Sequence, residues 1–328
     1  MRWGRSARRA KGDLPWHEEC RLMYAGIPVS VSFQPADDRL AAEVWADLDQ
    51  IDEVFNDHRD DSVIGRINAG GTGTFAQSEP LAAAFSMAED LQELSGGAFS
   101  ITTGPLRRLW RNAARTGQTP DPDMIAACRA ALEPTAWRRD GHSVTVLDPG
   151  VRFDFGGLIK GMAVDQVMKK LLDAGATAAL VQCGGETACR GLSRRGRTHV
   201  LGIPDPQQPD ERLWCALRDP GAGLSGSTSA NYRNPLAIAG TPCHHIFDPR
   251  SGLPVDTRIL SVSVVFPRWG CNGLADGLTT AGSVIGWREL FPMVTRQGGE
   301  ALVIVQEEGR VTSHATPGWE NLLEQGGI

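Results

Sequence analysis

The sequence predicts a mixed α/β protein, α+β in type, because strand-like and helix-like segments alternate along it. Residues 23–33 (MYAGIPVSVSF) alternate in polarity and are rich in valine, as strands are. Residues 38–55 place apolar side chains at helical spacing behind an aspartate that suits an N-cap. Residues 178–183 (AALVQC) form a short apolar run that is typical of a buried strand.

Further helices are expected along the chain. One runs over residues 80–94 and ends at a Ser-Gly-Gly stretch, and helical signal returns around residues 122–132. From Lys160 onward, apolar side chains recur near one face as far as Gly175, which suits a C-cap. A short helix is expected to begin near Ala275.

Further strands are also expected. Residues 144–155 (VTVLDPGVRFDF) resemble a hairpin with its turn at Asp-Pro-Gly. Residues 205–211 (DPQQPDE) are polar and predict a surface loop. The remaining predicted strands are residues 199–204, 213–218, 244–247, 260–266 and 301–306.

Composition and charge limit the class of protein. The chain has 328 residues, 33 Lys and Arg against 39 Asp and Glu, and a net charge of −6, which disfavours a nucleic-acid partner. Residues 1–20 are basic, but no apolar segment of a secretory signal follows them, and no stretch approaches the ~20 apolar residues of a transmembrane helix. We therefore expect a flexible segment over residues 1–20, one domain over residues 21–328, and a cytoplasmic location.

The cysteines do not indicate a disulfide framework or a zinc site. Seven are scattered along the chain without a CxxC pair. Buried, reduced thiols are expected, as in proteins of a reducing compartment.

Residues 151–165 (VRFDFGGLIKGMAVD) place glycines and a lysine where a strand meets a helix. They lack the GxxxxGK[ST] spacing of a phosphate-binding loop and the GxGxxG of a dinucleotide-binding fold. The first amides of the helix and Lys160 suit an anion such as a phosphate. Close packing at the glycines is the alternative interpretation.

Two later stretches carry further polar groups. Residues 244–255 (HHIFDPRSGLPV) join two histidines to a turn that an aspartate can cap. Residues 274–282 (LADGLTTAG) bring Asp276, Thr279 and Thr280 within about one helical turn. Their oxygens are the hard ligands that Mg²⁺ prefers, whereas the alternative is a helix N-cap at Asp276.

In this order, the stretches resemble the ApbE-type FAD:protein FMN transferases. The family's DxGGxAKGxAxD, GG, HIxDPxTGxP and ADxxxTA segments correspond to residues 154–165, 184–185, 245–254 and 275–281. Its MGTPxSV, YxxDSxISRxN and GGxFDxTxGPLxxLW segments are similar to residues 25–31, 58–68 and 96–110. The resemblance covers about residues 20–310, and the combination is specific although each segment alone is weak.

The resemblance implies a layered, T-fold-like domain with mixed or antiparallel sheets and packed helices. It implies that FAD is bound in a cleft with Mg²⁺ at the pyrophosphate. It also implies that FMN is transferred from FAD to a serine or threonine of an acceptor protein of the FMN-binding type, with release of AMP. Such a phosphoryl transfer needs charge neutralisation, fixed phosphate donors and a base for the hydroxyl.

The resemblance also implies roles for individual residues. His245 is the candidate base or orients the acceptor hydroxyl, and Asp248 either holds it or caps the turn. Asp276 serves both catalysis and metal binding. The implied metal ligands are Asp276 and Thr280 through side chains, and Gly157 and Thr279 through main-chain oxygens. The implied FAD contacts are Ala25, His58, Ala98, Phe99, Ser100, Asp154, Lys160 and Ile246.

Several positions depart from the family pattern. Ala25 replaces a methionine, His58 a flavin-stacking aromatic, and Ser100 an aspartate. Ile159 and Ala230 replace an alanine and a glycine. These departures lie mostly on the flavin side, so two alternatives to the transferase stay open: a Mg²⁺-dependent FAD pyrophosphatase, and a non-catalytic flavin-binding protein.

Overall fold

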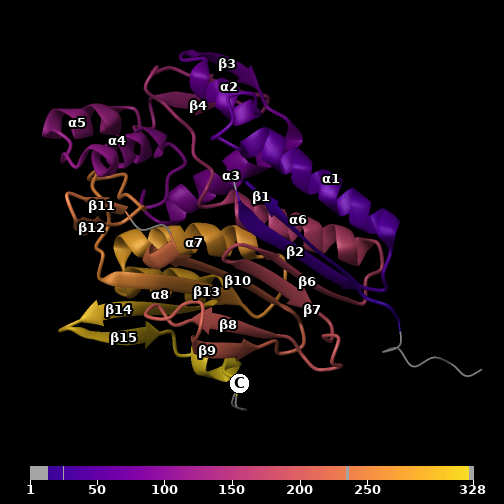
Figure 1. Ribbon diagram of the computed structural model, residues 1–328. Helices are drawn as coiled ribbons and strands as arrows, with labels where there is room; N and C mark the ends of the chain where they lie inside the picture. The colour runs from indigo at the N-terminus through magenta and orange to yellow at the C-terminus, as the bar shows by residue number, and fades with distance from the viewer. Residues whose placement is uncertain (1–13, 25, 234–235, 325–328) are drawn as a thin grey trace, which may run out of the picture.

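The computed structural model describes residues 14–24, 26–233 and 236–324. Eight strands form one sheet in the order β1-β2-β6-β7-β10-β13-β14-β15 (Figure 1). Every neighbouring pair in it is antiparallel. The strands are β1 (His17–Met23), β2 (Ile27–Gln34), β6 (Ala178–Cys183), β7 (Glu186–Arg190), β10 (Leu224–Ala230), β13 (Ile259–Phe266), β14 (Glu300–Glu307) and β15 (Arg310–Ala315).

Helices cover one face of this sheet (Figure 1). The helices α6 and α7 pack against the sheet and against each other, while α1 packs on α6 and α3 on α7. Alternate residues of β2 (Val29, Val31 and Phe33) are buried beneath this helical layer, as a strand with one apolar face requires. The helices are α1 (Asp38–Phe55), α2 (Val63–Ala69), α3 (Glu79–Leu94), α6 (Ile159–Asp173), α7 (Asn272–Ile285) and α8 (Trp287–Arg296).

The opposite face carries a separate hairpin of β8 (Val200–Pro204) and β9 (Leu213–Arg218). A second apolar cluster, which includes Leu201, Leu217 and Trp319, joins this hairpin to the sheet. The polar loop expected over residues 205–211 connects β8 to β9. A further small sheet has the order β3-β5-β4 and consists of β3 (Gly73–Ala76), β5 (Ser143–Val146) and β4 (Trp137–Arg139).

A third apolar cluster fixes the loop that contains the histidine pair. Trp110 donates a 2.9 Å hydrogen bond from its indole nitrogen to the Gly252 carbonyl, and its ring stacks on Phe247 with centroids 6.4 Å apart. Two segments distant in the sequence are therefore held together beside the sheet. The elements around this cluster are α4 (Gly104–Thr116), α5 (Pro122–Ala130), β11 (Leu236–Ile238) and β12 (Thr241–Cys243).

Most of the predicted elements are confirmed. The helices expected over residues 38–55, 80–94, 122–132 and 160–175 are α1, α3, α5 and α6, and the strand over residues 178–183 is β6. Gly175, which follows the C-cap Ala174 of α6, has a φ of +91°, as a helix-terminating glycine does. No helix among the described residues is long and apolar enough to cross a membrane.

The hairpin predicted over residues 144–155 is wrong. β5 ends at Val146 and pairs with β3 and β4 instead. Phe153 is held on both sides by Asn68, which donates to its carbonyl at 2.9 Å and accepts from its amide at 2.7 Å. Since a side chain satisfies this backbone, the segment needs no strand partner.

Further predicted segments differ from the structure. Residues 23–33 are divided between β1 and β2 by a turn in which the Gly26 amide bonds the Met23 carbonyl at 3.0 Å. Residues 244–247 are not a strand, because the Ile246 amide donates to the His244 ring at 3.0 Å rather than to a neighbouring strand. Most of the basic N-terminal segment lies outside the described residues, and its last four residues begin β1. The helices α2, α4 and α8 were not predicted.

Candidate functional site

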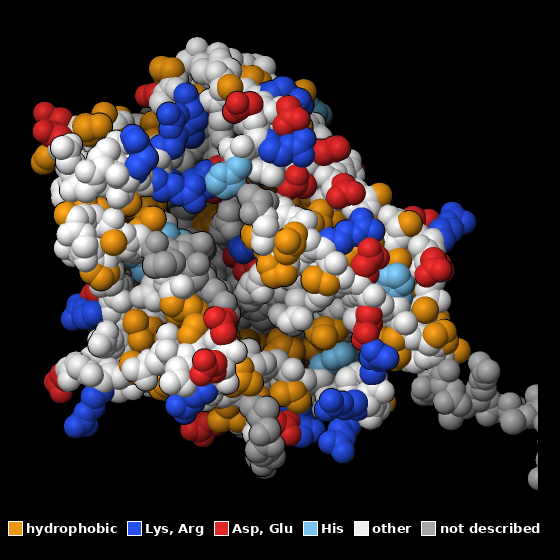
Figure 2. Space-filling view, in the orientation of Figure 1, with side chains coloured by type: hydrophobic (Ala, Val, Ile, Leu, Met, Phe, Trp, Pro, Cys, Tyr) orange, Lys and Arg blue, Asp and Glu red, His pale blue; other side chains and the backbone are white. Residues whose placement is uncertain are grey.

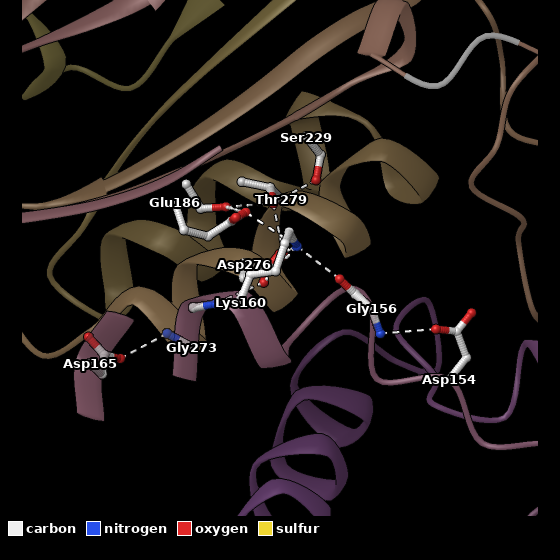
Figure 3. A network of polar contacts seen from close by, with 11 residues as sticks. Asp154, Gly156, Lys160, Asp165, Glu186, Ser229, Gly273, Asp276 and Thr279 are labelled. Atoms are coloured by element: carbon white, nitrogen blue, oxygen red, sulfur yellow. Dashed lines mark hydrogen bonds and ion pairs between the residues drawn. The ribbon is translucent and has the colours of Figure 1, made fainter. Parts of the chain in front are cut away.

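The site is built around Lys160, which lies in the first turn of α6. Its ammonium donates to both carboxylate oxygens of Asp276, at 3.2 and 3.1 Å, and to the Gly156 carbonyl at 2.8 Å. Glu186 approaches it at 3.4 Å (Figure 3). Segments from β7, α6 and α7 thus converge on one cation. The Lys160 side chain is 20% exposed, whereas the two carboxylate side chains are 2% exposed.

Electrostatics keep this lysine charged. Burial opposes the ammonium charge, but the nearby carboxylates of Asp276 and Glu186 outweigh that effect and raise the pKa of Lys160. Burial, together with the charge of Asp276, raises the pKa of Glu186 to about 8. At neutral pH the centre therefore holds a charged lysine beside a carboxyl group that resists ionisation. The second Glu186 oxygen, Oε2, is buried without a partner among the described residues.

The relative position of α6 and α7 fixes the distance between Lys160 and Asp276. Asp165 of α6 accepts hydrogen bonds from the Asn272 amide at 3.0 Å and the Gly273 amide at 2.9 Å, at the first turn of α7. A Cβ on Gly161 would lie 2.2 Å from the Asn272 carbonyl oxygen, so only glycine allows this approach. The alternative interpretation of Asp276 as an N-cap is wrong, because α7 begins four residues earlier and Asp165 binds its first amides.

The implied metal ligands lie around the same carboxylate. A Cβ on Gly157 would lie 2.7 Å from the Thr280 hydroxyl oxygen, so these two residues are adjacent. The Thr279 hydroxyl and carbonyl already have hydrogen-bond partners. The hydroxyl donates to the Asp276 carbonyl at 2.8 Å and lies 2.9 Å from the Ser229 hydroxyl, and the Thr279 carbonyl accepts from Ser283 at 2.9 Å.

One carboxylate with neighbouring hydroxyl and carbonyl oxygens suits Mg²⁺, which also takes phosphate and water ligands. The described part of the chain has no group of three His, Cys, Asp or Glu side chains arranged for a metal. The donor set fits an ion that a substrate helps to bind, rather than a site made by the protein alone.

Asp154 connects this centre to a neighbouring arginine. One of its oxygens accepts from the Gly156 amide at 2.9 Å, and the other pairs with Arg107 at 3.2 Å. Arg107 also forms an ion pair with Asp57. A polar chain therefore runs from Asp57 to Lys160 through the Gly156 main chain.

The two histidines have different partners. His244 is buried and accepts from the Ile246 amide, while the Nδ1 of His245 is buried without a partner among the described residues. Burial, with the positive charges of Arg111 and Lys160, lowers the pKa of His245 to about 4, so the ring is neutral at neutral pH. Asp248 accepts from the Arg250 amide at 2.9 Å and from the Arg250 side chain, so it caps the turn.

The residues expected to contact the flavin differ from one another in exposure. Ala98 and Phe99 are 1% and 2% exposed, so they present almost no surface to a ligand. The Ser100 hydroxyl lies 2.9 Å from that of Thr102. His58 lies on the surface with its side chain 49% exposed. The prediction for Ala25 lies outside the described residues.

Figure 2 shows the face of the molecule that is hollowed at its centre, with Lys and Arg side chains gathered along one side of the hollow. Sequence reasoning missed three residues of the surrounding network, namely Arg107, Asp165 and Glu186. Glu186 directly follows the Gly-Gly pair of the family pattern, and Asp165 is the last residue of the DxGGxAKGxAxD segment. Both therefore lay inside or beside motifs already noticed.

The fold and the site together define an antiparallel α/β protein with a lysine–carboxylate centre at the adjoining starts of two helices. A model of the ApbE family matches residues 25–304. The chain belongs to the ApbE family.

Relatives and solved structures agree with this assignment. The chain is 30% identical over 305 residues to the FAD:protein FMN transferase of Treponema pallidum, with 84% of this chain and 82% of that protein covered. It is 28% identical over 292 residues to that of Klebsiella pneumoniae, with 87% and 82% covered. The apo flavinyl transferase ApbE of Pseudomonas stutzeri is similar in structure, with a TM-score of 0.80, 25% identity, and 95% and 98% of the two chains covered. The ApbE protein of Thermotoga maritima also has a TM-score of 0.80 at 25% identity, with 94% and 100% covered.

Proposed function

We propose that this protein transfers FMN from FAD to a serine or threonine hydroxyl of an acceptor protein. In this reaction the hydroxyl oxygen forms a bond to the FMN phosphorus, the pyrophosphate bond breaks, and AMP leaves. The observation that carries the proposal is the convergence of Lys160, Asp276 and the Gly156–Gly157 main chain at one partly open centre. Its relatives named FAD:protein FMN transferase support the same activity.

The proposal includes a Mg²⁺ ion held by Asp276, Thr280 and the Gly157 carbonyl, with Thr279 contributing less. Mg²⁺ bound there would neutralise charge on the pyrophosphate as the bond to AMP breaks. Lys160 would hold a phosphate oxygen of FAD beside the same carboxylate, since its ammonium lies 3.1 Å from Asp276. Asp154 fixes the Gly156 amide, so the backbone that bears the Gly157 carbonyl is oriented before the substrate binds.

His245 is proposed as the base that takes the proton of the acceptor hydroxyl. Its ring is neutral, and its Nδ1 has no partner within the described chain. Bound FAD brings negative charge that counters Arg111 and Lys160, and this raises the proton affinity of the ring in the complex.

The remaining proposed FAD contacts are His58, Ala98, Phe99, Ser100 and Ile246. The cytoplasmic location and an acceptor of the FMN-binding type also remain predictions.

Incubation with FAD, Mg²⁺ and a purified FMN-binding acceptor domain separates the candidate functions. Flavin fluorescence that stays on the denatured acceptor band, with AMP released, is the expected result. Free FMN and AMP without labelled acceptor would instead identify a pyrophosphatase, an outcome that the replacement of a stacking aromatic by His58 would help to explain. Intact FAD bound to the protein would contradict both enzymatic activities.

A further inference from the structure

A groove of about 250 Å³ lies on the face of the sheet opposite α6 and α7, between that face and strand β8 (Figure 1). We call it the β8 groove. One wall is the main chain and side chains of residues 200–203 in β8. The floor comes from β6, β7, β10 and β13, where Gln182, Thr187 and Thr228 are polar and Leu180 and Val265 are apolar. None of these residues belongs to the FAD contacts or metal ligands proposed above.

One edge of β8 has no strand partner within the described residues, because β8 pairs only with β9. The Asp219 amide donates to the His199 carbonyl at 2.9 Å, which fixes the phase of this pairing. Hydrogen-bonded positions alternate along an antiparallel pair, so the main chain of Leu201 also faces β9. The amides and carbonyls of Val200 and Gly202 therefore face the other way. Both residues line the β8 groove and are exposed, the Val200 side chain by 47%.

This open edge is short and uncharged. Exposed strand edges are usually protected from pairing by charged side chains, prolines or bulges. Val200 and Gly202 carry no charge, and Pro204, which has no amide hydrogen, ends the edge directly beyond them. So short an edge is too small for a stable dimer of this chain, which needs an interface of about 1,200–2,000 Å². It suits a short extended segment of a substrate that must leave after reaction.

One end of the β8 groove adjoins the proposed reaction centre. Gly185 lines the groove, and the next residue is Glu186, whose carboxylate lies 3.4 Å from the Lys160 ammonium. A Cβ on Gly184 would lie 3.9 Å from the Lys160 side chain, so the turn of residues 184–185 separates the groove from the centre. Both glycines are exposed. An extended chain advances ~3.3 Å per residue, so a segment in the groove reaches the centre within a few residues.

Positive charge precedes β8 in the chain. The loop of residues 193–197 has the sequence SRRGR, in a protein whose net charge is −6. Arg194 forms an ion pair with Glu18 of β1. Arg195 and Arg197 are exposed, and neither has a carboxylate partner in the described part of the chain. Planar guanidinium groups bind carboxylates through paired hydrogen bonds, so this loop favours a partner with acidic side chains.

We infer that an extended segment of the acceptor protein binds in the β8 groove as an added strand, with acidic side chains beside the loop of residues 193–197. The inference rests on the proposed function, which requires an acceptor hydroxyl to reach the centre while its flanking residues cross the adjacent surface. Main-chain hydrogen bonds to Val200 and Gly202 give affinity for an extended chain, and the arginines give a preference for acidic sequences. The acceptor thus enters past Gly185, from the face of the sheet that FAD does not occupy.

Amide hydrogen exchange of the full chain, followed by NMR, tests the pairing with a purified FMN-binding acceptor domain. In the free protein, the Val200 and Gly202 amides should exchange fast and the Leu201 amide slowly, because only Leu201 bonds β9. Saturating acceptor domain should slow exchange at Val200 and Gly202 by at least about tenfold. Unchanged exchange at these two amides would overturn the inference. So would slowing that depends on the concentration of the protein itself without acceptor, since it would assign the edge to a second copy of this chain.

Two variants separate the main-chain and charge contributions. Val200→Pro removes one outward amide without breaking a bond to β9, and it should raise the KM for the acceptor domain about 2–10-fold, as the loss of one hydrogen bond does. Val200→Thr, which keeps that amide and the branched shape, is its matched control. Arg195→Glu/Arg197→Glu should raise the same KM at least about tenfold, and less so at high salt; the exposed Arg310→Glu on β15 is the control. A KM that is equal within either pair would contradict the inference.

FAD binding, followed by flavin fluorescence with Mg²⁺, and FMN transfer are measured on the same preparations. Transfer by the wild type without slowed exchange at Val200 and Gly202 would count against the inference alone. Slowed exchange without transfer would count against the proposed function alone. Loss of FAD binding in Val200→Pro would make the β8 groove part of the FAD site and would also contradict the inference.

Discussion

Lys160 illustrates how a single residue combines structural and chemical demands. Its ammonium lies between a buried aspartate and a buried glutamate, and it is bonded to a glycine carbonyl. Removal of one partner from such a centre leaves a buried charge unpaired, which is strongly destabilising. The charged Lys160 and Asp276 and the largely protonated Glu186 therefore form one electrostatic unit, and changes to any of them are expected to affect both stability and ligand binding.

Glu186→Gln is predicted to change how stability depends on pH. The pKa of this carboxyl group rises from 4.5 to about 8 on folding, so the folded protein binds the extra proton between these values. Wild-type stability should therefore fall as pH rises from about 4.5 to about 8, and this part of the decrease should be absent in the variant. Urea unfolding at pH 5, 7 and 9 measures the effect, with the exposed Glu133→Gln as control. Parallel pH curves for Glu186→Gln and wild type would disprove the assigned shift.

His245→Gln is predicted to lower FMN transfer by about 10²–10⁴-fold, the usual effect of losing a general base. FAD affinity should change little, because the proposed role concerns the hydroxyl proton rather than the flavin. Single-turnover rates and FAD titrations separate the two effects, and the exposed His142→Gln serves as the control. A variant that transfers FMN at the wild-type rate would exclude His245 as the base.

At the scale of elements, the contact between α6 and α7 sets the geometry of the site. Gly161→Ala would place a methyl group 2.2 Å from the Asn272 carbonyl oxygen, so the two helices must separate. We expect a loss of stability of about 1–3 kcal/mol, typical of overpacking, together with weaker FAD binding. Thermal unfolding and FAD titration check this expectation. Gly73→Ala in β3 is the matched control, because its nearest neighbour would lie at 3.5 Å; equal effects of the two substitutions would refute the packing argument.

The elements also explain why the sequence predicted some features and not others. Helices α1 and α6 have clear periodicity, so their positions followed from local pattern. The segment around Phe153 resembled a strand because its side chains are apolar, but Asn68, distant in the sequence, binds its backbone instead. Helix α4 is a different case, because its buried Leu106, Leu109 and Trp110 recur at helical spacing, so its pattern was present in the sequence and was overlooked. The contact between Asn68 and Phe153, by contrast, cannot be inferred from spacing.

In the candidate site, too, residues in local motifs were predicted and residues that act through long-range contacts were not. Lys160 and Asp276 were named because they lie in recognisable motifs, and the structure brings them to 3.1 Å. Glu186, by contrast, contributes through burial and through its proximity to Lys160, and neither can be read from a single sequence. Arg107 was missed for a similar reason, since its partners Asp57 and Asp154 are about 50 residues away on either side.

At the scale of the whole molecule, binding of Mg²⁺ and FAD should be coupled. The proposed metal ligands contribute one carboxylate, and the rest of the coordination shell would come from substrate phosphates and water. We therefore expect FAD to raise the midpoint of thermal unfolding much more with Mg²⁺ than with EDTA, because ligands that bind only the folded state stabilise it. Equal stabilisation by FAD in Mg²⁺ and in EDTA would contradict a shared site.

The central claim, that the centre around Asp276 transfers FMN, is tested most directly by intact-mass spectrometry of the acceptor domain after incubation with FAD and Mg²⁺. The wild type should add one FMN phosphoester at a serine or threonine and release an equal amount of AMP. Asp276→Asn should reduce this addition by more than about a hundredfold, because even outer-shell partners of a metal contribute 10–100-fold. Asp173→Asn, an exposed change on α6, should leave it intact. An unmodified acceptor with the wild type, or full modification with Asp276→Asn, would contradict the account.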